Sequence, residues 1–358
     1  MTDRRSLLKG LAAAAILPVR GWAAAGSPDW VAAARQPDGS HALHGITRSG
    51  AIPFTVPMPG RGHAAAAHPF RAEVVAFARR PGIFGLVIDC RDGSLIRQLR
   101  PPEGRQFNGH GAFSADGARL YTSEVVAEGS AGRIGVWDVR AGYRRLGEWD
   151  SHGIGPHELK LLPGGDIAVA NGGIETDPND RTPLNLDRMA PNLTLLDGEG
   201  GLISTRALGA ELAQNSIRHL AALPDETLAF AMQWQGDAGA AVPLLGLADA
   251  RGLSTHAPGT GEEYAMKGYA GSIAAVPAGL IAMTSPRGGV VMIHDGQGVH
   301  LASLKRADIC GAAPLDDARF ALTDGGGAIW AADPGGLTLI ARHDLAWDNH
   351  LVRVSAQA

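Results

Sequence analysis

The stretch HGAFSADGARLYTSE (residues 110–124) contains a pattern that recurs along the chain and indicates the fold. A short apolar strand that begins with histidine leads into a polar turn, and a second apolar strand follows. Related segments are HELKLLPGGDIAVAN (157–171), HLAALPDETLAFAM (219–232), SIAAVPAGLIAMTS (272–285) and CGAAPLDDARFALTD (310–324), with a looser first copy in HAAAAHPFRAEVVAFAR (63–79). Such internal repetition indicates a fold built from similar units.

Each copy is followed by a second hairpin with a polar turn, as in FGLVIDCRDGSLIRQL (84–99) and IGVWDVRAGYRRLGEW (134–149). Two hairpins provide the four strands of one propeller blade. The copies begin 47, 47, 62, 53, 38 and 40 residues apart, at His63, His110, His157, His219, Ser272, Cys310 and His350. This spacing is typical of WD40-like propeller repeats, whose period is about 40–50 residues.

The last copy, HLVRVSAQA (350–358), has room for only one strand. Its three missing strands are found near the other end, in WVAAARQ (30–36), HALHGITR (41–48) and AIPFTVPM (51–58). Strands from both ends in one blade would close the ring and remove open sheet edges. We therefore predict an all-β, seven-bladed β-propeller over residues 26–358.

Composition excludes several classes of protein. Hydrophobic residues make up 45% of the 358, which excludes a disordered chain. The 32 basic and 36 acidic residues give a net charge of −4 with no basic block, which argues against nucleic-acid binding. Two cysteines, Cys90 and Cys310, cannot form a disulfide framework or a four-thiolate zinc site. We expect a monomer without a membrane span in the mature chain.

The N-terminal residues resemble a twin-arginine export signal. Arg4 and Arg5 precede an apolar stretch over residues 11–19, and small residues at Ala23–Ala25 suit a cleavage site. We therefore expect residues 1–25 to be an export signal and the mature protein to be periplasmic. This route carries proteins that are already folded, which is compatible with loading a cofactor beforehand.

Histidine begins five of the seven repeats. The innermost strand of each blade lines the central channel, so equivalent positions converge on the axis. Imidazole, thiol and carboxylate groups gathered there would suit a transition metal or a haem iron. We interpret as candidate ligands His63, His110, His157, Glu158, His219, Cys310 and His350, and as further contacts to a bound group Arg61, Asn108, Arg218 and Asn349. Iron, copper and haem all remain open, and the alternative is that the histidines only tie blades together by hydrogen bonds.

An insertion over residues 171–192 is too long for a simple strand connection and is rich in proline and asparagine. Such loops are often functional, but a plain surface excursion explains the length equally well. Asp177, Asn179 and Asp180 lie in it without an EF-hand pattern, so a solvated loop is favoured over a calcium site.

Several motifs resemble those of a bacterial periplasmic family of unknown function with a predicted seven-bladed propeller fold. They are RGH (61–63), FNGHG (107–111), GPHELK (155–160), SIRHLA (216–221) and WDNHLV (347–352). Members of that family are encoded beside imelysin-type iron-uptake proteins. The resemblance implies a binding or accessory role in periplasmic iron acquisition, with iron-uptake proteins as partners, and it supplies no catalytic residues.

Two other functions stay open at this point. Lactonases and quinoprotein dehydrogenases also use propellers, and fold alone does not decide function. A lactonase would need several carboxylates at the axis, whereas Glu158 is the only acid at a repeat start. A pure interaction scaffold with structural histidines is the second alternative.

Overall fold

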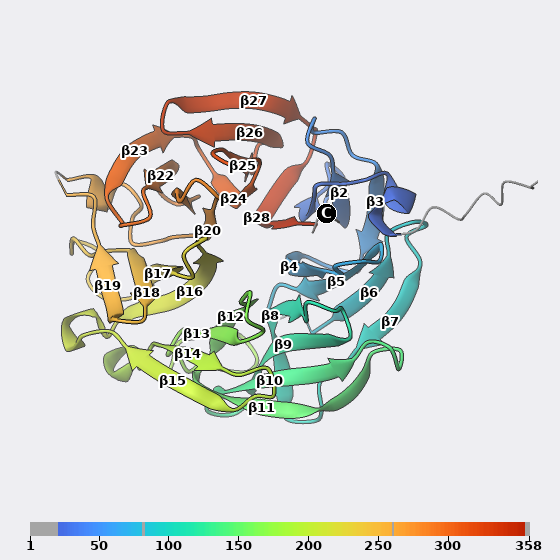
Figure 1. Cartoon of the computed structure of the whole chain (residues 1–358), viewed down its shortest axis with the longest axis horizontal. Coiled ribbons are helices and arrows are strands. Elements are labelled where there is room, and N and C mark those ends of the chain that lie inside the picture. The colour runs from blue at the N-terminus through green and yellow to red at the C-terminus, as the bar shows by residue number, and fades with distance from the viewer. Residues whose placement is uncertain (1–20, 81–82, 260, 355–358) are drawn as a thin grey trace, which may run out of the picture.

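The computed structural model describes residues 21–80, 83–259 and 261–354, and these form seven four-stranded antiparallel sheets arranged around an axis (Figure 1). The innermost strands carry the seven predicted repeat starts: β4 (Gly62–Ala67), β8 (Arg105–Phe113), β12 (Pro156–Leu161), β16 (Asn215–Ala222), β20 (Ser272–Ala275), β24 (Ile309–Pro314) and β28 (Ala346–Arg353). The prediction of a seven-bladed propeller is confirmed.

In six blades, the three strands that follow the inner strand step outward in chain order. The first three of these blades contain β5 (Glu73–Ala78), β6 (Gly85–Asp89) and β7 (Leu95–Leu99); β9 (Arg119–Val126), β10 (Ala131–Asp138) and β11 (Arg144–Ile154); and β13 (Ile167–Asn171), β14 (Asn192–Leu196) and β15 (Leu202–Ala207). The next three contain β17 (Leu228–Trp234), β18 (Leu245–Asp249) and β19 (Gly252–His256); β21 (Ile281–Ser285), β22 (Val290–His294) and β23 (His300–Lys305); and β25 (Phe320–Asp324), β26 (Ala328–Asp333) and β27 (Gly336–Arg342).

The seventh blade closes the ring with strands from both ends of the chain. Its order is β28, then β1 (Trp30–Arg35), β2 (His41–Ile46) and β3 (Phe54–Met58). Pairing of β1 with β28 runs from Trp30 opposite Arg353 to Arg35 opposite Ala346. The inner strand of this blade therefore comes from the end of the chain, as the repeat pattern predicted.

The hydrophobic core is divided into seven clusters, one between each pair of neighbouring blades. Aromatic side chains such as Phe77 and Phe230 are fully buried in the middle strands, where the blades are farther apart than at the axis. Alanine is frequent in several inner strands, as in Ala64–Ala67 of β4, where little space remains because seven sheets converge. Each blade is thus held mainly by burial of apolar area against its two neighbours.

Short 3₁₀ helices lie outside the blades: Gly21–Ala25, Leu186–Arg188, Ala210–Leu212 and Glu262–Tyr264. In the first of them Trp22 is buried against the closing blade and donates from Nε1 to the carbonyl of His68 at 2.9 Å. Residues 1–20 of the predicted export signal lie outside the described residues. Among the described residues, no helix is long and apolar enough to span a membrane.

Closure of the ring predicts a large effect at Trp30. This side chain is 1% exposed, packs with Trp347 and Leu351 of β28, and donates from Nε1 to the carbonyl of Pro314 at 3.1 Å. Trp30→Ala should lower the free energy of unfolding in urea by about 3–5 kcal/mol. Leu95→Ala on outer strand β7, where the side chain is 57% exposed, should change it by about 0.5 kcal/mol or less. Equal effects of the two substitutions would contradict the packing described at the closure.

Candidate metal centre

Breaks in strand register bring the histidines toward the axis. Pairing of β4 with β5 is interrupted between Gly62 and Ala65, which releases His63 from the ladder. Comparable breaks occur at the other histidine-bearing inner strands, and at Cys310 in β24. Strand β20, which carries Ser272, pairs with β21 without a break. A bulge adds unpaired residues and redirects side chains. The breaks release His63, His110, His157 and His350 from the ladder, whereas in β16 the unpaired residue is Arg218 and His219 pairs with Ala231.

Five imidazoles pack together at the axis. Ring centroids lie 4.7 Å apart for His63 and His350, 4.8 Å for His63 and His110, and 4.7 Å for His157 and His219. His110 is also 4.7 Å from His157 and 4.8 Å from His350, so it lies in the middle of the group. The sequence prediction that these five histidines converge agrees with the structure.

Their nitrogen atoms fall into two overlapping triads that could hold a metal ion: His63, His110 and His350, and His110, His157 and His219. Within each triad, one nitrogen per residue lies within 4.8 Å of the others. Nε2 of His63 and Nε2 of His110 are 3.2 Å apart. Two imidazole nitrogens bound to one tetrahedral ion at about 2.0–2.1 Å would be about 3.4 Å apart, so the His63–His110 pair already has a suitable separation.

Several ring nitrogens in this group are buried without a hydrogen-bond partner: Nδ1 of His63, Nδ1 of His157 and Nε2 of His350. Buried polar atoms are normally paired, because an unpaired one loses its hydration without compensation. Burial also lowers the pKa of all five imidazoles, to about 3 for His219, where the nearby Arg218 adds to the effect. The histidines are therefore neutral at pH 7, which is the protonation state that binds metals.

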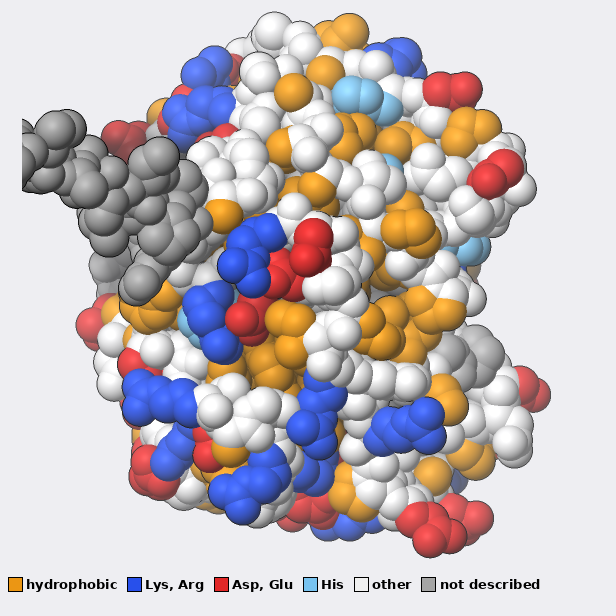
Figure 2. Space-filling view, turned by 90° about the vertical axis from the view of Figure 1, so that its right-hand side faces the viewer, with side chains coloured by type: hydrophobic (Ala, Val, Ile, Leu, Met, Phe, Trp, Pro, Cys, Tyr) orange, Lys and Arg blue, Asp and Glu red, His pale blue; other side chains and the backbone are white. Residues whose placement is uncertain are grey.

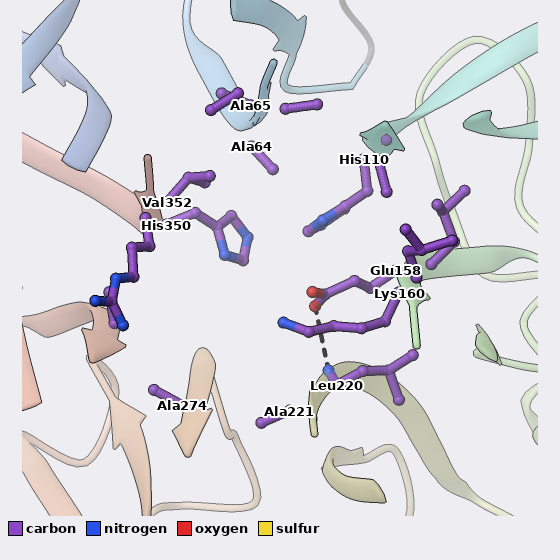
Figure 3. Close-up of a pocket in the computed structure, with 18 of the residues that line it drawn as sticks. Ala64, Ala65, His110, Glu158, Lys160, Leu220, Ala221, Ala274, His350 and Val352 are labelled. Carbon is purple, nitrogen blue, oxygen red and sulfur yellow. Dashed lines mark hydrogen bonds between the residues drawn. The ribbon is translucent and has the colours of Figure 1, made fainter. Parts of the chain in front are cut away.

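Two cavities flank the histidine layer. Residues that follow the histidines along the inner strands line a funnel of about 490 Å³, into which His110, His350, Glu158 and Lys160 project (Figure 3). Alanine is the commonest residue in its walls. Residues that precede the histidines, including Arg218 and Asn349, line a smaller pocket of about 180 Å³ on the other side. His63, His157 and His219 reach this second pocket, which we call the arginine pocket.

Glu158 lies beside the histidines without joining either triad. Its Oε2 is 3.3 Å from Nδ1 of His219 and accepts a hydrogen bond from the backbone N–H of Leu220 at 3.2 Å. This contact orients the His219 ring so that its Nε2 is free for the axis. A carboxylate that positions a ligating histidine is common around metal ions.

Cys310 and Arg61 are not brought into the histidine group. Cys310 belongs to the apolar cluster between its own blade and the closing blade, where its Sγ contacts the carbonyls of Thr323 and Trp347 at 3.4 and 3.6 Å. Burial raises the pKa of this thiol to about 12, which makes it a poor metal ligand. Arg61 forms a two-pronged ion pair with the buried Asp348 at 2.9 and 2.8 Å.

Asn108, Arg218 and Asn349 do line the arginine pocket, on the side of the histidine layer away from the funnel. Four more arginines, which the repeat pattern did not predict, line this pocket: Arg79, Arg80, Arg181 and Arg287. Arg181 comes from the long insertion. Its Nη1 donates a hydrogen bond to the backbone carbonyl of Arg80, which belongs to another blade, at 3.3 Å. The Asp177 and Asp180 carboxylates of the insertion accept hydrogen bonds from neighbouring backbone N–H groups in tight turns. The insertion thus supplies a charged side chain to the axis.

Burial of neutral histidines predicts a steep pH dependence of stability in the metal-free protein. Their folded pKa values lie below the unfolded value of about 6.5, so the unfolded chain takes up more protons below that pH. Stability should be complete above pH 6.5 and fall below it, by about 1.4 kcal/mol per pH unit for each neutral histidine.

Urea unfolding at pH 7.5, 6.5, 5.5 and 5.0 measures this slope. A His63→Gln/His157→Gln variant should show a shallower slope, and His152→Asn, at an exposed position, should match the wild type. An unchanged slope in the double variant would show that these imidazoles are protonated in the folded protein.

Comparison with known structures supports the fold. The chain is similar to the structure titled "Structure of U3-55K" (TM-score 0.58, 12% identity, 80% of this chain and 82% of that chain) and to one titled "Crystal Structure of Mitotic Checkpoint Complex" (0.56, 14%, 79% and 77%). It also resembles the computationally designed Ika8 protein (0.54, 18%, 86% and 81%). At these identities the likeness concerns the fold alone.

No curated protein matches the sequence. A family model described as "Protein of unknown function (DUF1513)" matches residues 56–354, from the third strand of the closing blade through its inner strand β28. That match covers every axial histidine and every arginine of the pocket. The chain therefore belongs to the DUF1513 family.

Proposed function

We propose that this protein binds a transition-metal ion at its axial histidines and serves as a binding or accessory protein in periplasmic iron acquisition. The observation that carries the proposal is the set of buried, neutral imidazoles with unpartnered nitrogens at the axis. Histidines that only tied blades together would be expected to use both ring nitrogens in hydrogen bonds to neighbouring blades. Here His63 and His110 are within hydrogen-bond distance of each other and His219 contacts Glu158, but Nδ1 of His63, Nδ1 of His157 and Nε2 of His350 have no partner.

The packing favours a bare ion over haem. Contacting ring centroids are separated by 4.7–5.8 Å, so a porphyrin plane does not fit between the imidazoles. Imidazole donors suit iron, copper, nickel and zinc, and neither triad contains a thiolate or a carboxylate. Both triads use His110, so we expect one ion per chain.

Iron is proposed as the biological metal because the motifs around the histidines resemble a family encoded beside iron-uptake proteins. The periplasmic location is proposed on the paired Arg4 and Arg5 and the apolar stretch that follows them. A lactonase-type site has less support, because Glu158 is the only carboxylate that lines either axial cavity in the described part of the chain.

Loss of the shared ligand tests the metal site. Wild-type protein is first cleared of metal and then titrated with Cu²⁺, with Zn²⁺, or with Fe²⁺ under anaerobic conditions. It should bind one ion that remains after dialysis. His110→Gln should weaken binding by about tenfold or more, because it removes a ligand from both triads. Calorimetry and elemental analysis measure affinity and stoichiometry.

His152→Asn is the matched control, since His152 is exposed and already has a left-handed backbone conformation that asparagine tolerates. A wild type that retains none of the three metals would overturn the proposal and favour a protein-interaction scaffold.

A second test keeps every ligand and disturbs only its position. Gly109 has φ +97°, and a Cβ there would overlap the ring of His63. Gly109→Ala should therefore displace His63 and weaken metal binding several-fold. Gly129→Ala introduces a similar backbone strain at φ +75° with nothing within 4 Å of the new methyl group, so it should lower stability without changing metal affinity. Equal metal affinity of the two variants would argue that His63 is not a ligand.

A further inference from the structure

Five arginines converge on the 180 Å³ pocket beside the histidine layer. Arg79 and Arg80 follow β5, Arg218 lies on β16, and Arg287 follows β21; Arg181 comes from the long insertion. None of the described residues that line this pocket carries a carboxylate. Four partly buried guanidinium groups and the exposed Arg287, which stacks on Tyr269 at 4.2 Å, thus concentrate positive charge around a pocket whose lining contains no counter-charge.

Hydrogen bonding leaves these guanidinium groups incompletely satisfied. Nη1 of Arg79 and the Nε atoms of Arg80, Arg181 and Arg218 are buried without a partner. The nearest acid, Asp348, is already held by Arg61, and its Oδ1 is 4.0 Å from Nη1 of Arg79, too far for a hydrogen bond. Buried charges are normally paired, so the pocket lacks a group that the protein does not supply.

Surface arginines of the same chain behave differently. Arg251 pairs with Asp249 and Arg319 pairs with Asp316. On the side of the molecule shown in Figure 2, basic and acidic side chains are interspersed with apolar ones. The buried, unpartnered guanidinium nitrogens of the pocket thus distinguish it from these exposed ion pairs.

Repulsion among these guanidinium groups contributes to lowering their pKa values. Burial, together with the neighbouring Arg181 and Arg218, lowers the pKa of Arg80 to about 9. Burial and the nearby Arg181 lower the pKa of Arg218 to about 10. An anion placed among these groups would relieve both the loss of hydration and the repulsion.

We propose that the arginine pocket binds a small oxyanion carrying two or three negative charges, such as phosphate or a compact polycarboxylate. Guanidinium groups form paired hydrogen bonds with the oxygens of carboxylates and phosphates. Amides of Asn108, Gln233 and Asn349 line the same pocket and can donate to further oxygens. The volume is smaller than that of typical sites for drug-sized ligands, which restricts the occupant to a few heavy atoms.

The same anion would assist the metal site. His63, His157 and His219 line the arginine pocket, so a bound cation would lie beside five positive charges. An anion between them reduces that repulsion, and one of its oxygens can complete the coordination of the metal. Anion and metal should therefore strengthen each other's binding, as linkage requires. This coupling rests on the proposed metal function, whereas the anion site itself does not.

The anion site is tested first in metal-free protein. Metals are removed on a chelating resin, because a soluble chelator is itself a polyanion and would compete. Calorimetry in low-salt Tris chloride with inorganic phosphate, and separately with citrate, should show one anion per chain and weaker binding as salt increases. The probe that binds more tightly, phosphate or citrate, identifies phosphate or polycarboxylate as the class of ligand.

Arg218→Gln is the informative variant, because the Arg218 guanidinium makes no hydrogen bond with the described residues. It should weaken anion binding about tenfold or more, as should Arg181→Gln. Arg251→Gln, at an exposed arginine, should leave binding unchanged. The Arg218→Gln protein should unfold at the same or a higher temperature than wild type without anion, since a repelling charge is gone.

Two results would overturn the anion site: failure of wild type to bind either probe, or binding that Arg218→Gln and Arg181→Gln leave unchanged. Metal titrations with and without the better anion then test the coupling, for which we expect a change in metal affinity of about fivefold or more. Anion binding without any metal binding would retain the anion site and reject the metal function. Metal binding without anion binding would retain the metal function and reject the anion site.

Discussion

Closure of the ring by pairing β1 with β28 is the constraint on which the rest of the structure depends. It places His350, from the last strand, beside His63 of the first complete blade, with ring centroids 4.7 Å apart. Without that closure the inner strands would have no common axis. The core supports the same arrangement, because each apolar cluster joins two neighbouring blades and the ring shares its stability among all seven interfaces.

At the axis, breaks in strand register direct histidine side chains away from the blade interfaces. A regular inner strand would place alternate side chains between blades, whereas the bulges turn the histidines toward one another. The energetic consequence is large, because imidazoles buried together lose hydration and cannot all be charged. Such an arrangement is unfavourable as pure scaffolding and is readily explained by a ligand that uses the nitrogens.

The two sides of the histidine layer differ in chemistry. The funnel side is lined by many alanines together with Glu158 and Lys160. The opposite side gathers Arg218 from inner strand β16, Arg79, Arg80 and Arg287 from segments that follow second strands, and Arg181 from the insertion. The proposed metal site and the proposed anion site share three histidines and would stabilise each other, because the cation would offset the anion and the anion would offset the arginines. The fold itself, which unrelated proteins share at 12–18% identity, decides none of this.

The sequence by itself determined the seven blades, the closing strands and the convergence of five histidines, because strand periodicity and repeat spacing are local patterns. Only the tertiary structure shows which other side chains lie beside those histidines. Cys310 occupies the same repeat position as the histidines, yet its small apolar thiol packs into the core between two blades. Arg79 and Arg80 follow the second strand β5, Arg287 follows the second strand β21, and Arg181 lies in an insertion, so these arginines do not recur from blade to blade as the histidine position does. Their meeting depends on how antiparallel strands and a long loop return to the axis, which only the three-dimensional packing specifies.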